Sequence, residues 1–189
     1  LIGMAKDGQY LREARDIIAS GFRWACQTGP LCGEPMRGVK VKLIDAQLHE
    51  ETVHRGSAQI MPATRRAILG SFLTGKPILL EPMYKIGISV PVQWVGESTS
   101  IITRKRGRII SSEQKGALTM IVGYIPVAET FGLTAEMRTA TSGHAFWQCT
   151  FDHWEKVPEN IAAKVIKNMR ERRGLPPEIP TADKFIDNV

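Results

Sequence analysis

A period of two runs through residues 80–90, which read LEPMYKIGISV. Apolar residues take every second position from Leu80 to Val90, which is typical of a strand with one buried face. The elements expected after this strand are a helix at 92–102, strands at 108–113 and 118–124, a helix at 133–140 and a strand at 146–150. The order βαββαβ predicts a ferredoxin-like domain. We therefore expect the chain to belong to the α+β class.

Residues before 79 have helical spacing on either side of one alternating segment. Apolar residues recur at steps of three and four between Leu11 and Ala25, which predicts a helix. Residues 39–43, VKVKL, then alternate as a half-buried strand does, and the phase of this alternation changes near Ile44 and Asp45. A second helix follows. Its buried side is expected to consist of Ile60, Ala63, Ala67, Ile68 and Phe72.

One strand and two helices do not complete a sheet, because a lone strand leaves both backbone edges unpaired and one face uncovered. The chain also begins with Leu1 instead of Met. Both observations lead us to expect that residues 1–78 are the later part of a larger domain. Residues 79–189 are expected to form the second domain, closed by a helix that begins after Pro158 and ends at Gly174.

The composition favours polyanionic partners without identifying one. Lys and Arg number 25 and Asp and Glu number 19 among 189 residues, so the formal charge is +6. No apolar run approaches the roughly 20 residues that span a bilayer, and we expect a cytoplasmic protein without a membrane partner. Three cysteines at irregular spacing fit neither a disulfide framework nor a zinc knuckle, so we expect reduced thiols.

Motifs for catalysis and cofactor binding fail on spacing or context. The glycine spacing of a phosphate-binding loop recurs at 70–76, but Pro77 stands where a hydroxyl must bind magnesium. His49 and His54 are five residues apart, whereas the histidines of a zinc-protease helix are four apart. No Gly-x-Ser-x-Gly elbow is present. We therefore expect no catalytic residue, no metal and no cofactor in this chain.

Basic residues gather around the alternating segment and the helix that follows it. A strand, a loop and a helix start can bring such side chains to one end of a domain, which is the convergence that phosphate contacts need. Charge alone leaves RNA contact and a solvated surface equally open. The two aromatic signature strands of an RNA-recognition motif are not found. The candidate contacts are Lys40, Lys42, Arg55, Arg65 and Arg66.

Three stretches resemble one family of translation factors. Residues 33–67, GEPMRGVKVKLIDAQLHEETVHRGSAQIMPATRRA, resemble the fourth domain of the archaeal and eukaryotic elongation factor 2 family. Residues 127–158, VAETFGLTAEMRTATSGHAFWQCTFDHWEKVP, resemble its fifth domain, and residues 170–180, RERRGLPPEIP, resemble the tail of its archaeal branch. The three stretches follow the order of the family across nearly the whole chain.

The resemblance implies a partial unit like ribosomal protein S5 over residues 1–78, followed by a ferredoxin-like domain with a C-terminal helix. It implies that His54 lies at a loop tip, is converted to diphthamide and is the target of ADP-ribosylation. Arg55 and Gly56 beside it are then expected to contact the ribosome as well. The partners it implies are ribosomal RNA, the tRNA–mRNA duplex of the decoding site and the diphthamide-synthesis enzymes. Residues 57–59, SAQ, replace further glycines of eukaryotic relatives, so we expect a stiffer loop.

The function implied by the resemblance is that of a C-terminal fragment of a translational GTPase that promotes translocation of tRNA and mRNA. GTP and magnesium would then belong to a domain of the parent protein that is absent here, and this chain by itself would not be an enzyme. Without the resemblance, His54 reads as an ordinary loop histidine. A stand-alone ribosome- or RNA-binding protein without GTPase function is the alternative, and an enzyme with a scattered active site is a further one.

Overall fold

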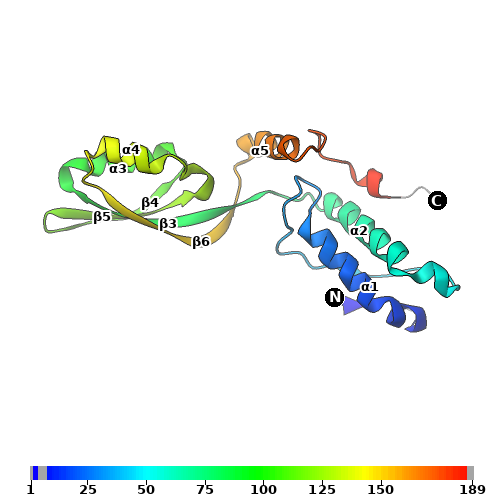
Figure 1. The fold of residues 1–189 in the computed structure, drawn as a ribbon. Helices are drawn as coiled ribbons and strands as arrows, with labels where there is room; N and C mark the ends of the chain where they lie inside the picture. Colours follow the sequence, from blue (N-terminus) through cyan, green and yellow to red (C-terminus); the bar gives the residue numbers. More distant parts are fainter. Residues whose placement is uncertain (1, 4–7, 187–189) are drawn as a thin grey trace. The chain divides into compact units, whose positions relative to one another are not determined.

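The computed structural model describes residues 2–3 and 8–186, which form two compact units. The first unit comprises residues 1–78 and 159–189, and the second comprises residues 79–158. In Figure 1 the ribbon of the second unit runs from green to yellow, and the first unit takes the blue, cyan, orange and red parts. Each unit has its own hydrophobic core and is described by itself.

The second unit contains a four-stranded antiparallel sheet with two helices on one face (Figure 1). The strands lie in the order β4-β5-β3-β6, so β3 pairs with both β5 and β6. This strand order and these crossover helices confirm the predicted ferredoxin-like arrangement. The elements are β3 (Leu80–Pro91), η2 (Val92–Trp94), α3 (Val95–Arg104), β4 (Arg108–Lys115), β5 (Leu118–Pro126), η3 (Val127–Glu129), α4 (Leu133–Ala140) and β6 (Phe146–Lys156).

The core of the second unit lies between the sheet and the helices α3 and α4, and all these layers contribute buried side chains to one cluster. Ile86, Ile88 and Val90 of β3 are completely buried, which confirms the face expected from their spacing. Strand β5 also keeps a period of two, but its buried face carries Ile121 and Ile125. The alternation that predicted this strand, through Leu118, Met120, Val122 and Tyr124, lies on the opposite and less buried face. The alternating pattern therefore identified both central strands of the sheet.

Arg106 connects three segments of the second unit. It follows α3 with a left-handed φ of 58°, and its two terminal nitrogens donate to the carboxylate of Glu81 at 2.7 and 2.8 Å. Its Nε donates to Glu129 at 2.8 Å. These charge-assisted hydrogen bonds, those to Glu81 above all, raise the pKa of the guanidinium above its usual range. One cation thus holds β3, the end of α3 and η3 together.

The first unit is built on two helices, α1 (Gly8–Gln27) and α2 (Ser57–Thr74), which lie side by side (Figure 1). Two small clusters of buried residues join them, and each cluster takes residues from both helices. The clusters are Ala14, Ile18 and Ile60, and Ala25, Ile68 and Leu69. The other elements of the unit are β1 (Ile2–Gly3), β2 (Lys42–Leu43), η1 (Thr52–Arg55), α5 (Glu159–Arg172) and η4 (Ala182–Phe185).

The alternating segment of the first unit forms less strand than expected. Only β2 is hydrogen-bonded, and it pairs in parallel with β1. The expected strand over 39–43 is thus shortened to two residues, and among the described residues it has one neighbouring strand. Its burial still alternates along 39–43, and Ile44 and Asp45 are both exposed where the phase change was predicted. The pattern therefore reports burial correctly even where the ladder of hydrogen bonds is short.

Helix α5 belongs to the first unit because of its buried Arg170. The residue is 5% exposed, and its Nη1 donates to the carbonyl oxygens of Pro30 at 3.0 Å and Leu31 at 2.7 Å. A buried guanidinium needs such acceptors, since an unpaired charge is strongly disfavoured away from water. The sequence analysis assigned residues 159–189 to the second domain, whereas these contacts group them with the first unit.

An apolar groove of about 830 Å³ opens between α1, α2 and residues 39–48. Ala63 and Ala67, which helical spacing predicted to be buried, line this groove and are exposed. The apolar stripe of α2 is therefore present as predicted, but among the described residues no element packs over the part of it that carries Ala63 and Ala67. Apolar as this face is, no described helix combines the length and the apolar character that crossing a membrane requires.

Candidate functional site: the loop before α2

His54, the residue expected to be functional, lies in an exposed loop that leads into α2. We call residues 49–56 the tip loop. Its middle forms η1 (Thr52–Arg55), and Gly56 is the N-cap residue of α2. The side chain of His54 is 55% exposed, and the apolar Val53 beside it is 81% exposed. The loop therefore presents both side chains to its surroundings and neither to the core.

Arg55 holds the tip loop in shape. Its side chain is only 9% exposed, and its Nη1 donates to the carbonyl oxygens of His49, at 2.9 Å, and of Glu50. Its Nη2 lies 3.3 Å from Thr52 Oγ1 and 3.4 Å from Glu13 of α1. The planar guanidinium suits this role because it offers five donors in a fixed geometry. A residue predicted as an RNA contact is thus turned toward the backbone of its own loop.

Three side chains of the tip loop meet on its surface. Glu51 Oε2 lies 3.4 Å from His54 Nε2, and the rings of His49 and His54 meet edge to face with centroids 4.6 Å apart. The backbone N–H of Glu51 donates to His49 Nδ1 at 3.1 Å. The sequence analysis considered His49 only for its five-residue spacing from His54 and did not single out Glu51. Loop closure, which no local pattern reveals, brings both to His54.

Gly56 and the two lysines of the alternating segment remain accessible. Lys40 and Lys42 are exposed, and the half-buried neighbours that alternate with them fix which side of the segment they occupy. Gly56 has an extended backbone with φ of −73°, so its conformation does not require glycine. A Cβ there would lie 3.0 Å from the flexible side chain of Gln59. Gly56 thus contributes small size to the loop and no unusual turn.

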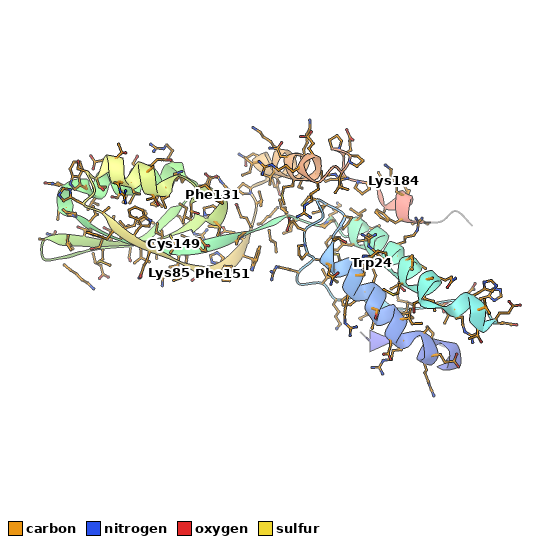
Figure 2. All side chains as sticks on the ribbon, in the orientation of Figure 1. Trp24, Lys85, Phe131, Cys149, Phe151 and Lys184 are labelled. Carbon is orange, nitrogen blue, oxygen red and sulfur yellow. The ribbon has the colours of Figure 1, made fainter. Side chains whose placement is uncertain are left out.

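Arg65 and Arg66 lie along α2 and not at its start. Arg65 is eight residues after Ser57, which is about 12 Å along a helix that rises 1.5 Å per residue. Its guanidinium lies 4.7 Å from the centre of the ring of Trp24, which Figure 2 labels on α1, and its Nη2 donates to Thr28 at 3.2 Å. Both arginines are half-buried. The convergence that we expected at one end of the unit is therefore not found for Arg65.

A second group of titratable side chains lies on the sheet of the second unit. His153 Nδ1 is 2.7 Å from Asp152, and its Nε2 is 3.3 Å from Glu155. The hydrogen bond to Asp152, and then that to Glu155, raises the pKa of His153. Arg108 donates to Glu155 at 2.9 Å and lowers the pKa of that carboxyl, while the ring of Tyr124 packs against His153. Sequence reasoning missed this group because its members come from three strands.

Comparison with known proteins gives matches over most of the chain. Residues 1–76 match the family model described as elongation factor G, domain IV, and residues 78–165 match that described as elongation factor G C-terminus. Elongation factor 2 of Sulfurisphaera tokodaii is 49% identical over 94% of this chain, and that of Korarchaeum cryptofilum is 43% identical over 96%. A solved structure from Thermus thermophilus covers 89% of this chain with a TM-score of 0.77 and 25% identity.

These matches agree with the structure at one boundary and differ from it at the other. The C-terminal match extends to residue 165 and so includes the start of α5, which the structure groups with the first unit. The two matched regions meet at residue 77, close to the boundary between the two units after Ile78. The chain spans about a quarter of the length of these relatives, 24% and 25% of the two elongation factors and 25% of the solved chain. Neither matched region is a GTP-binding domain. The chain belongs to the elongation factor 2 and elongation factor G family, and its two matched regions are similar to domain IV and to the C-terminus of elongation factor G.

Proposed function

We propose that this chain acts as the C-terminal part of a translational GTPase and that its tip loop contacts the decoding site during translocation of tRNA and mRNA. The observation that supports this best is the loop itself. In a region similar to domain IV, the exposed His54 stands on a backbone that the loop's own Arg55 fixes. GTP and magnesium belong, in this proposal, to another part of the parent protein.

Sequence-independent contact is what such a factor requires, because it serves every codon. Phosphates and ribose hydroxyls are common to all codons, whereas base edges are not. Conversion of His54 to diphthamide would add a cationic arm that reaches such groups, and ADP-ribosylation at the same ring would block it. The diphthamide-synthesis enzymes are therefore further partners in this proposal, which also places the protein in the cytoplasm.

The stiffness of the tip loop supports this role. Arg55 ties together the backbone on both sides of the loop before any partner is present. Less conformational freedom then remains to be lost on binding, which favours affinity. In this account Arg55 positions His54, while the exposed Lys40 and Lys42 are free to approach phosphates and Gly56 keeps the loop narrow. Arg65 and Arg66 contribute mainly to the packing of α2.

Site-specific photo-crosslinking tests this proposal with two matched positions. The two positions are Val53 in the tip loop and Phe131 in the second unit, and both residues are apolar and 81% exposed. Figure 2 labels Phe131. A photoreactive phenylalanine analogue at either position should leave the fold intact, because exposed substitutions usually have small effects on stability. Each variant is mixed with archaeal ribosomes that carry mRNA and tRNA, irradiated, and its crosslinked RNA is sequenced.

We expect the analogue at position 53 to crosslink to RNA of the decoding site on the small subunit. The analogue at position 131 should give no decoding-site product. Replacing His54 by Ala in the first variant should reduce the yield, since the side chain that makes the contact is then gone. Crosslinks from position 53 that are spread over both subunits would contradict the proposal and favour a stand-alone RNA-binding protein.

A further inference from the structure

The geometry points to a divalent transition-metal site formed by His49, Glu51 and His54. Each residue offers one ligand atom, and the three atoms lie within 4.8 Å of one another on the surface of the tip loop. All three residues are exposed, so an ion can reach them directly from solvent. Among the described residues this is the only group of three histidine, cysteine, aspartate or glutamate side chains with such spacing.

Two imidazoles and one carboxylate suit zinc, copper, nickel or cobalt better than magnesium or calcium. With bond lengths near 2.1 Å, the ligand atoms of a tetrahedral zinc site are about 3.4 Å apart. The Glu51 and His54 atoms already have this separation, at 3.4 Å. The remaining separations, at most 4.8 Å, need to shrink by no more than about 1.4 Å, which rotation of exposed side chains allows. Three protein ligands leave the fourth position open to water.

Arg55 prepares the loop for such a site. By donating to the carbonyl oxygens of His49 and Glu50, it fixes the backbone from which the first two ligands project. Its guanidinium is largely buried and occupied by these oxygens, by Thr52 and by Glu13, and it is not itself exposed beside the ligands. The loop is thus closed before an ion binds, and less chain entropy is lost on binding.

One ring nitrogen of His49 already accepts a hydrogen bond within the loop. The backbone N–H of Glu51 donates to His49 Nδ1 at 3.1 Å. A ring nitrogen that accepts a hydrogen bond is also the kind of atom that binds a metal ion. Binding through Nδ1 replaces this one hydrogen bond, and because the loop is exposed, water can take up the released N–H.

This site goes beyond the proposed function and does not rest on it. It requires only the unmodified imidazole of His54, so it is testable in protein made by a bacterial host. The metal site and the proposed modification share the side chain of His54. An ion bound to this ring occupies the group that a modifying enzyme must reach. Zinc at this loop would therefore slow any modification of His54.

The test is a titration of the full 189-residue chain with zinc by calorimetry and with cobalt by visible absorption. The variants are His49→Ala, Glu51→Gln and His54→Ala. The matched control is His144→Ala, an exposed histidine of the second unit whose Nδ1 contacts only the carbonyl of Thr141. Burial raises the pKa of all three cysteines, which disfavours the thiolate form that binds metal ions. Circular dichroism checks that each variant is folded.

We expect one equivalent of metal in the parent chain and in the control. Each of the three loop variants should lose at least ten-fold in affinity, because even outer-shell changes weaken metal sites by about 10 to 100-fold. Affinity within two-fold of the parent in all three loop variants would overturn the inference. An equal loss in the control would overturn it too, because the histidine responsible would then lie outside the loop.

Discussion

The two units differ in how completely they cover their own apolar surface. The second unit buries ten residues in one continuous cluster, whereas the first divides its core between two clusters of three. The first unit also leaves an apolar groove open between its helices and residues 39–48. The comparison teaches that a βαββαβ order contains everything its core needs, while two helices and a two-residue strand pair do not.

The difference extends to what each unit exposes. The second unit fixes its helix ends with ion pairs such as that between Arg106 and Glu81. The first unit uses Arg55 in the same manner, but the segment that it fixes is a solvent-exposed loop with two histidines and two glutamates. A small core thus supports an accessible loop, which is where binding residues are commonly found.

The largest expected effect is a cavity in the continuous core. Ile88→Ala should lower the free energy of unfolding of the second unit by about 2–5 kcal/mol, because Ile88 is completely buried. Urea denaturation followed by the emission of Trp94 and Trp147, which pack against this core, measures it. Ala67→Ser in the groove is the matched control and should change stability by less than about 0.5 kcal/mol. Equal shifts in both variants would remove the distinction between the units.

Arg55→Ala should have the next largest effect, confined to the first unit. It removes largely buried hydrogen bonds from a charged donor, and we expect a loss of about 1–3 kcal/mol in local stability. Hydrogen exchange of the tip loop, compared with that of β3, measures this loss. The control is Lys42→Ala, which removes an exposed cation of the same unit. Unchanged protection of the loop in Arg55→Ala would show that the guanidinium does not hold it.

A smaller effect concerns pH and the second unit alone. The folded pKa of His153 is raised above its usual 6.5, so its contribution to stability is full below about pH 6.5 and is lost as pH rises through the folded pKa. The folded pKa of Glu155 is lowered from 4.5, so its contribution is present above that value and is lost as pH falls through the folded pKa.

Both contributions are therefore complete between about pH 4.5 and 6.5. His153→Gln should flatten the fall in melting temperature of the second unit above this window, and His144→Ala should not. Melting temperatures of both variants, measured at intervals of half a pH unit, test this expectation. If the slope above pH 6.5 survives in His153→Gln, another group is responsible for it.

The smallest expected effect is that of His54→Ala on stability. The side chain is more than half exposed and pairs only with exposed partners, so the free energy of unfolding should change by less than about 0.5 kcal/mol. Thermal melting of the first unit checks this. A clear destabilisation would mean that His54 is a structural residue. The tip loop could then not be described as an exposed functional loop, in contrast to the closed core of the second unit.

Periodicity predicted the elements because burial imposes a period on every strand and helix. It did not predict which face of β5 is covered. Leu118 and Val122 are as apolar as Ile121 and Ile125, and only the docking of α3 and α4 on one side of the sheet selects the buried pair. Packing between elements, which the sequence of one strand does not contain, makes that choice.

The direction of long charged side chains was also beyond sequence reasoning. Arg55 and Lys40 were both candidate RNA contacts, yet loop closure turns Arg55 inward while the alternating burial of residues 39–43 leaves Lys40 exposed. The partners of Arg170 could not be predicted from the local sequence either, since its acceptors, Pro30 and Leu31, are about 140 residues away in the chain. Charge can be read locally, but the partner of a charge is set by tertiary structure.

The most direct test of the proposed function is the mass of one peptide from protein isolated from its native host. Cleavage after Lys42 and Arg55 releases residues 43–55, LIDAQLHEETVHR, which contain both His49 and His54. Fragmentation then assigns any added mass to one histidine, so His49 serves as an internal control. We predict an added mass on His54 alone. An unmodified His54, or a modification on His49, would contradict the account of the tip loop as the modified functional centre of this elongation factor region.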